Sequence, residues 1–294
     1  MAKKFSKPEL SRKINGDIPF DAKKSPELDE VPTMRLDMAL LENYPRYSRA
    51  TIQKFIKDGR AKVAGEIILK PNYIVDENEE LELDLPPEIQ PEKPPVIYED
   101  DNVIVFNKPA GMLSIKKGQF SPEQAIEDFG EIVHRLDRDT SGVIIVAKNL
   151  ETKAYLQKQF QERKTHKTYF AVTEGIPQPN KAIISVPLAR NLKKPTTFIP
   201  DKNGREAITE YSVVDNNDTR ALVCLKPKTG RTHQLRIHMA YLKTPILGDK
   251  VYNPSSTKAD RMYLHAASLE ITIPGGQRMT FTAEMPEDFR NVLR

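Results

Sequence analysis

Five prolines fall between Pro86 and Pro95, and this cluster constrains the fold of the 294-residue chain more than any other feature. Proline has a fixed φ and no backbone N–H, so neither a helix nor a central strand continues through it. Such a stretch is typical of a stiff, extended linker. We therefore predict a linker over residues 87–95 that separates two folding units, residues 34–86 and residues 96–294.

Residues 1–33 mix lysine, serine, proline and acidic residues without apolar periodicity, which predicts a disordered extension. No apolar run approaches the ~18 residues of a membrane span, and no signal-peptide pattern is visible. The single cysteine excludes a disulfide framework and any Cys-rich zinc or iron–sulfur site. We expect a cytoplasmic protein that does not bind a membrane.

The smaller unit is predicted to contain two helices followed by short strands. Apolar residues recur at helical spacing over residues 36–40 and 52–56, and they alternate with polar residues over 81–85. Charge is separated within this unit: residues 46–62 hold six bases and one acid, and residues 76–84 hold six acids. The basic part predicts a helix face that contacts phosphates, and an ordinary solvated face is the alternative. Its candidate contacts are Arg49, Lys57 and Arg60.

The larger unit mixes strands and helices. Continuous apolar runs over residues 103–106 and 143–146 predict strands that are buried on both faces. Residues 150–163 and 232–242 have helical patterns, and residues 207–225 read as a hairpin. The fold class that follows is α+β with a mixed sheet.

The densest polar cluster spans residues 134–142 and leads directly into a buried strand. Its central acid is Asp137. Cationic neighbours favour the ionised form of such an acid, which suits a nucleophile or a base. These neighbours are His134, Arg135 and Arg138. The alternative is a surface turn laced with ion pairs.

Residues 229–238 form a second polar cluster. Gly230 and Thr232 predict a tight turn and a helix start, which places Arg231 where an anion or a carboxylate could be met. The five histidines of the chain stand singly and without cysteine partners, so no metal site is expected.

These two clusters carry a resemblance. Residues 134–142, followed by Ala147 and Lys148, resemble the catalytic signature of RluA-type RNA pseudouridine synthases, a group that includes RluC-like and RluD-like enzymes. Other segments resemble further motifs of that family in the same order: 107–111, 167–171, 229–238, 245–249, 264–266 and 281–289. Residues 34–86 are similar to the alpha-L RNA-binding domain that many of these synthases carry. The resemblance implies a pseudouridine synthase fold, with a mixed central sheet, flanking helices and an active-site cleft.

By this resemblance Asp137 starts the cleavage of the uridine glycosidic bond, as a nucleophile or as a base. Arg231 is expected to pair with Asp137 and keep it ionised. Tyr169 would stack on the base and assist proton removal from C5. Arg135 would fill the gap that a flipped nucleotide leaves. The remaining expected substrate contacts are His134 and Lys108.

Reactant and product of this reaction are isomers, so the resemblance implies neither a cofactor nor a metal. The expected substrate is large-subunit ribosomal RNA, with transfer RNA as the alternative, and the expected protein is a monomer. Two other classes stay open. One is a non-catalytic RNA-binding protein of ribosome assembly. The other is a hydrolase that uses Asp137 and Asp139, although an aspartic protease needs a second equivalent acidic loop and the sequence has no second copy.

Overall fold

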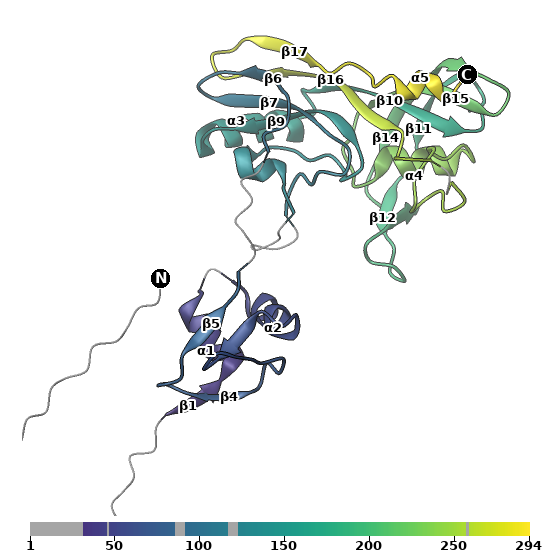
Figure 1. Ribbon diagram of the computed structural model, residues 1–294. Coiled ribbons are helices and arrows are strands. Elements are labelled where there is room, and N and C mark those ends of the chain that lie inside the picture. The colour runs from purple at the N-terminus through teal and green to yellow at the C-terminus, as the bar shows by residue number, and fades with distance from the viewer. Residues whose placement is uncertain (1–31, 46, 86–91, 117–122, 257–258) are drawn as a thin grey trace, which may run out of the picture. The chain divides into compact units, whose positions relative to one another are not determined.

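The computed structural model describes residues 32–45, 47–85, 92–116, 123–256 and 259–294 (Figure 1). The predicted extension over residues 1–33 therefore lies almost entirely outside the described residues, as does most of the predicted linker. The chain divides into two units: a small one that ends at Leu85 and a large one that takes in the chain from Pro86 to Arg294.

The small unit contains two helices and five short strands among its described residues. In chain order they are β1 (Thr33–Arg35), α1 (Leu36–Asn43), α2 (Arg49–Lys57), β2 (Ala61–Val63), β3 (Glu66–Ile67), β4 (Ile74–Asp76) and β5 (Leu81–Leu83). β1 pairs with β4, and a second sheet has the order β3-β2-β5. The apolar side chains that share a helix face form the buried centre, namely Leu36, Leu40, Ile52 and Ile56. The predicted helical spacing over 36–40 and 52–56 is confirmed.

The large unit is built on a mixed sheet, as predicted. Its first strands are β6 (Val96–Glu99), β7 (Val103–Lys108), β8 (Glu131–Ile132) and β9 (Ser141–Ala147), with the 3-10 turn η1 (Ile126–Phe129) before β8. Helix α3 (Leu150–Gln161) leads to β10 (His166–Glu174), β11 (Lys181–Ser185), β12 (Leu188–Arg190) and β13 (Phe198–Pro200). The remaining elements are β14 (Ile208–Asn216), β15 (Arg220–Pro227), α4 (Gln234–Tyr241), β16 (Leu264–Thr272), β17 (Arg278–Thr282) and α5 (Asp288–Asn291). The main strand order is β11-β14-β15-β10-β16-β9-β7-β6, and only β16 and β9 run parallel to each other.

Strand β9 is buried on both faces, as its continuous apolar run predicts. Val143 and Ile145 belong to the cluster that packs against α3, and Ile144 and Val146 belong to another cluster with Phe106. Because alternate residues of a strand point to opposite faces, each face of β9 meets its own core. The loop that precedes β9 is therefore anchored on a rigid element.

The parallel junction between β9 and β16 depends on Gly142. The two strands pair at only two positions, one of which joins Gly142 to Ala266. A Cβ atom on Gly142 would lie 2.2 Å from the carbonyl oxygen of Ala266, and the φ angle of +110° is itself one that favours glycine. Glycine thus lets the end of the polar loop reach the middle of the sheet.

Candidate active site

The loop before β9 and helix α4 bring a carboxylate and a guanidinium together. Nη1 of Arg236 donates a hydrogen bond of 2.9 Å to Oδ2 of Asp137. The Asp137 side chain is 26% exposed, so it can still be reached from solvent. A charge-assisted contact of this kind favours the ionised carboxylate.

The predicted pairing of Arg231 with Asp137 is wrong, because Arg236 occupies that place. Helix α4 begins at Gln234, so Arg231 lies in the preceding turn whereas Arg236 lies in the first turn of the helix. Nε of Arg231 donates instead to the carbonyl oxygen of Glu206 at 2.9 Å. Arg231 still lines the same pocket as Asp137.

Arg236 is itself held by a second carboxylate that the sequence analysis did not single out. Nε and Nη2 of Arg236 donate to the two oxygens of Asp249 at 2.7 and 2.8 Å, and the Asp249 side chain is fully buried. Burial alone would lower the pKa of Arg236, but the bonds to Asp249 and Asp137 outweigh it and raise that pKa. Arg236 is therefore a permanent cation, fixed from behind and aimed at Asp137.

Tyr169 lies in β10, where it pairs with Leu225 of β15 and with Ala266 of β16. This central position in the sheet places the ring on the floor of the pocket that contains Asp137. Burial first, and the charge of Asp137 second, raise the pKa of the Tyr169 phenol. The phenol is consequently neutral at physiological pH.

The pocket around Asp137 is strongly basic. Its volume is about 440 Å³. The basic side chains that line it are Arg135, Arg163, Lys167, Lys228, Arg231 and Arg236, whereas Asp137 is the single acid among the described lining residues. Lys167 stands out because no described residue accepts a hydrogen bond from its Nζ atom or forms an ion pair with it, and burial lowers its pKa. Arg163, Lys228 and Arg236 also form ion pairs with acids outside the lining, namely Glu206, Glu210 and Asp249. The three remaining cations, Arg135, Lys167 and Arg231, fit a polyanionic ligand.

The structure assigns different roles to two neighbours of Asp137. Arg135 is exposed, its Nη2 atom donates to Oγ1 of Thr232 at 2.9 Å, and it lines the pocket. His134 lines the pocket, but its Nε2 atom accepts the backbone N–H of Ile145 at 3.2 Å and its ring stacks on Phe160. Burial, with a smaller effect of nearby Lys167, lowers the pKa of His134 to about 3. His134 is thus neutral and bonded to β9, and its expected contact with RNA stays a prediction.

Lys108 is not a substrate contact. Its side chain is fully buried at the end of β7. Its Nζ atom donates to the carbonyl oxygens of Pro109, Met112 and Arg138 at 2.9, 2.8 and 2.9 Å. An ammonium has three donors, so these bonds use all of them. Lys108 instead ties the segment after β7 to the loop that carries Asp137.

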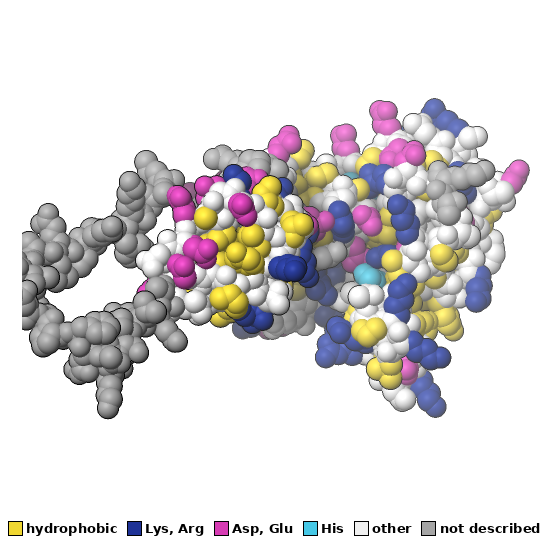
Figure 2. Space-filling view, turned by 60° about the horizontal axis from the view of Figure 1, so that its bottom comes forward, with side chains coloured by type: hydrophobic (Ala, Val, Ile, Leu, Met, Phe, Trp, Pro, Cys, Tyr) yellow, Lys and Arg dark blue, Asp and Glu magenta, His cyan; other side chains and the backbone are white. Residues whose placement is uncertain are grey.

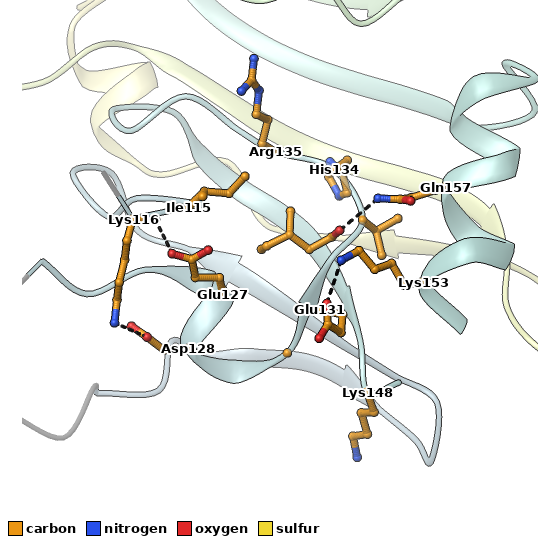
Figure 3. Close-up of a pocket in the computed structure, with 13 residues that line it drawn as sticks. Ile115, Lys116, Glu127, Asp128, Glu131, His134, Arg135, Lys148, Lys153 and Gln157 are labelled. Carbon is orange, nitrogen blue, oxygen red and sulfur yellow. Dashed lines mark hydrogen bonds and ion pairs between the residues drawn. The ribbon is translucent and has the colours of Figure 1, made fainter. Parts of the chain in front are cut away.

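A second hollow lies next to the pocket, on the other side of His134 and Arg135 (Figure 3). Two of its lysines are already paired with acids that line the same hollow. Figure 3 shows Lys116 bonded to Asp128 and Lys153 bonded to Glu131. Because these pairs neutralise each other, we assign the chemistry to the pocket around Asp137.

The basic helix of the small unit is organised by one buried acid, Asp37 of α1. Its carboxylate accepts from Nε of Arg49 at 3.0 Å, from Gln53 at 2.6 Å and from two nitrogens of Arg35 at 3.0 and 3.2 Å. Burial would raise the pKa of Asp37, but the bonds from its partners lower it to about 2. Arg35 and Arg49 remain 44% and 48% exposed. The two arginines are therefore held in place at the surface.

The other predicted phosphate contacts of the small unit lie at its surface. Lys57 is exposed at the end of α2. Arg60 is 37% exposed and faces Asp84, with the nearest charged atoms 3.9 Å apart. The expected basic face is thus present, and the positions of Lys57 and Arg60 leave them open to a ligand.

Two negative findings apply to the described residues alone. No helix in this part of the chain is long and apolar enough to cross a membrane. Nor do the described histidine, cysteine, aspartate and glutamate side chains include a group of three or more that could hold a metal ion.

Comparison with known proteins matches both units. Residues 102–241 match the family model of RNA pseudouridylate synthases, and residues 34–81 match that of the S4 domain. An uncharacterized RNA pseudouridine synthase of Aquifex aeolicus is 35% identical, over 88% of this chain and 92% of that protein. The ribosomal large subunit pseudouridine synthase D of Borreliella burgdorferi is also 35% identical, over 87% of each.

Other relatives match the large unit more than the small one. The dual-specificity RNA pseudouridine synthase RluA of Escherichia coli is 41% identical, over 66% of this chain and 93% of that protein. The solved structure of human RNA pseudouridylate synthase domain containing 1 aligns with a TM-score of 0.57 and 26% identity. That alignment covers 67% of this chain and 86% of the human one.

Proposed function

Because this chain belongs to the RNA pseudouridine synthase family, whose enzymes are isomerases that act on RNA, we propose that it modifies specific uridines of large-subunit ribosomal RNA. One observation carries the proposal: Asp137 is the single acid among the described residues of a basic pocket, and Arg236 is bonded to it at 2.9 Å. A hydrolase of the aspartic-protease kind needs two carboxylates that share a proton. Asp139, the other acid of the loop, is exposed and does not line this pocket.

Asp137 starts the reaction in this proposal. Its carboxylate either attacks C1′ of the uridine or removes the proton from C2′, and the bond between C1′ and N1 breaks. The uracil then turns and bonds to C1′ through C5. In the first route the bond from Asp137 to C1′ breaks as this bond forms, and in the second route Asp137 returns the proton to C2′. The proton of C5 is lost and N1 is protonated, so the atoms balance without any co-reactant. Arg236 keeps Asp137 ionised for the first step.

Tyr169 contacts the uracil. Its raised pKa keeps the phenol protonated, so we assign it stacking and hydrogen-bond donation rather than action as a phenolate. An aromatic ring on the pocket floor is a surface on which a detached base can turn while it stays bound.

The basic side chains around the pocket bind the RNA backbone. Lys167 is the best candidate for the phosphate of the target nucleotide, since no described residue neutralises its Nζ atom. A phosphate beside Lys167 would restore the charge that burial disfavours. Arg135, an exposed residue that lines the pocket, is placed to fill the space that a flipped uridine leaves in a helix.

A basic hairpin made of β12 and β13 extends this surface; in Figure 1 it projects from the large unit. Residues 188–205 contain one acid, Asp201, and five exposed bases. These are Arg190, Lys193, Lys194, Lys202 and Arg205. Figure 2 shows Lys and Arg side chains over this side of the large unit. Such contacts supply affinity and position the RNA without reading its sequence.

The extent of the similarity supports ribosomal RNA as the substrate. The relative named for the ribosomal large subunit matches 87% of the chain, which requires both units. The dual-specificity relative matches 66% of the chain, about the length of the large unit alone. Modification of transfer RNA is the second candidate, and the name of that relative, a dual-specificity RNA pseudouridine synthase, fits an enzyme that is not restricted to one kind of RNA.

Pseudouridine mapping of ribosomal and transfer RNA in a strain that lacks the gene tests the substrate. We expect at least one large-subunit ribosomal site to lose its pseudouridine and to regain it with the wild-type gene but not with Asp137→Asn. Loss confined to transfer RNA would establish the second candidate. An unchanged map in both RNA classes would refute the proposal.

A further inference from the structure

His233 lies immediately before α4 in a backbone conformation that histidine rarely adopts. Its φ and ψ angles are 56° and 18°, in the left-handed region. Glycine or asparagine enters this region at lower cost. Strained residues of this kind persist where surrounding contacts hold them, and they cluster at functional sites. The position therefore calls for contacts that keep this particular ring in place.

The His233 ring has such contacts on both nitrogens. Its Nε2 atom lies 3.9 Å from Oδ1 of Asp137, the oxygen that Arg236 does not bind. Its Nδ1 atom lies 2.9 Å from the hydroxyl of Tyr252. The same hydroxyl oxygen accepts the backbone N–H of Phe198 at 3.0 Å. The ring is also flanked edge-on by the rings of Phe198 and Tyr252.

These contacts favour one direction for the protons. The Asp137 carboxylate lies 3.9 Å from Nε2, and its negative charge favours a proton on the ring nitrogen that faces it. In a neutral ring the other nitrogen, Nδ1, then accepts, and the donor beside it is the Tyr252 hydroxyl. The oxygen of that hydroxyl accepts the backbone N–H of Phe198. In this tautomer the Phe198 N–H donates to Tyr252, the Tyr252 hydroxyl donates to His233, and the Nε2–H of His233 faces Asp137.

From this geometry we propose that His233 is a positioning residue for Asp137, held as the Nε2–H tautomer by Tyr252 and by the backbone of the β13 residue Phe198. The proposal rests on the role of Asp137 in the proposed function. Arg236 holds one oxygen of the carboxylate and His233 restrains the other, which defines the plane in which Asp137 meets the ribose. The β12–β13 hairpin is thereby linked to the Asp137 carboxylate through the side chains of Tyr252 and His233.

The charges around the ring agree with a neutral histidine. Burial lowers the pKa of His233, and Arg236 and Arg135 act in the same direction. Asp137 and Asp249 oppose this effect, but the pKa still lies below its ordinary value. A neutral ring can restrain the carboxylate without taking its charge away, which a nucleophile or base requires.

Nitrogen NMR of the histidine rings in the full-length protein, without RNA, tests the tautomer. His233 is assigned from the signals that disappear in His233→Gln. We expect the Nε2–H tautomer at pH 7.5 in the wild type and a mixture of tautomers in Tyr252→Phe, which keeps the ring but lacks the hydroxyl. A wild-type ring in the Nδ1–H or the doubly protonated form would overturn the proposal.

Single-turnover rates on 5-tritiated uridine RNA test the consequence. We expect His233→Ala to slow the chemical step by about 10- to 100-fold, as loss of outer hydrogen-bond partners does at metal sites. His233→Gln, which offers an N–H at similar reach, should stay within about threefold of the wild type by the same reasoning. Equal losses in both variants, or a normal rate in His233→Ala, would refute the role.

The two measurements fail independently. If the wild type releases no tritium from any RNA, the proposed function fails while the NMR result still decides the tautomer. If His233→Ala does not fold, Tyr252→Phe takes its place in the rate measurement, with an expected loss of about tenfold. A normal rate in Tyr252→Phe would then contradict the proposal. His166→Gln, at an exposed position of β10, is the matched control for a histidine exchange.

Discussion

The guanidinium of Arg236 donates to the carboxylate of Asp137 across 2.9 Å, although 99 residues separate the two in the chain. Asp137 lies in the loop before β9, and Arg236 lies in helix α4. Asp249 binds the opposite edge of the same guanidinium and is fully buried. The carboxylates of Asp137 and Asp249 therefore share one cation.

Asp137→Asn should abolish isomerisation and leave RNA affinity within about tenfold of the wild type, because the lost charge acts on the glycosidic bond and not on phosphates. Tritium release and filter binding measure the two quantities. Asp139→Asn is the matched control, since Asp139 is exposed in the same loop. Equal loss of activity in both variants would mean that the acids have been assigned the wrong way round.

Arg236→Met should abolish activity and lower the free energy of unfolding by about 3–5 kcal/mol, the cost of leaving a buried charge without its partner. Here that charge belongs to Asp249. Urea unfolding measures the loss. The double variant Arg236→Met/Asp249→Asn should recover part of the stability and none of the activity, because Asp137 still lacks its partner.

Arg231→Met separates the two arginines of this segment. Arg231 contacts a carbonyl oxygen and lines the pocket, so its loss should raise KM and leave the unfolding free energy nearly unchanged. A loss of stability as large as that of Arg236→Met would contradict the assignment.

His134 makes stability depend on pH with a definite sign. Its pKa is about 3 in the folded protein and near 6.5 in the unfolded chain. Between these values the unfolded chain binds the proton and the folded protein does not, so stability falls as pH falls. From pH 7 to pH 5 the loss from this residue is about 2 kcal/mol. His134→Gln, which keeps an acceptor for the Ile145 N–H, should lose less stability over this interval in urea titrations.

The effect of Asp37→Asn on RNA affinity distinguishes two explanations of how the small unit binds RNA. If only net charge matters, removing a negative charge beside Arg35 and Arg49 should tighten RNA binding. If Asp37 acts by holding the two arginines, binding should weaken, and we expect a loss of about tenfold, equivalent to about 1.4 kcal/mol. Affinity over a salt series decides between them, with amide exchange in α1 and α2 as the control for folding.

Lys57→Gln/Arg60→Gln should weaken binding of every RNA sequence by a similar factor. Each phosphate contact releases about one counterion, so the slope of log affinity against log salt should become less steep by about two. Lys158→Gln, a 73% exposed residue on α3 of the large unit, is the control. An unchanged slope in the double variant would remove these residues from the RNA interface.

Strong local patterns made part of the fold predictable. The apolar runs over residues 103–106 and 143–146 became β7 and β9, and the hairpin turning near residues 216–218 became β14 and β15. The pattern over residues 150–163 became α3. The strand order was not predictable in this way, because pairing between distant strands depends on contacts that no local pattern records.

The site was predicted as a segment but not residue by residue. Asp137 and Tyr169 line one pocket, whereas the choice between Arg231 and Arg236 failed because it depended on where α4 begins. A signal for Arg236 was present: it lies three residues before Met239 and so shares a helix face with it, and an arginine on a buried face must be paired. The strained backbone of His233 left no trace in the sequence.

The contact between Gly142 and Ala266 also joins the two parts of the site. Asp137 precedes this junction in the chain, whereas Tyr169, His233 and Arg236 all follow β9 and come from the far side of the sheet. Since β16 lies between β9 and β10, a chain in which β16 has not docked would hold Asp137 apart from Tyr169, His233 and Arg236. We therefore expect activity towards RNA to appear only once β16 is in place.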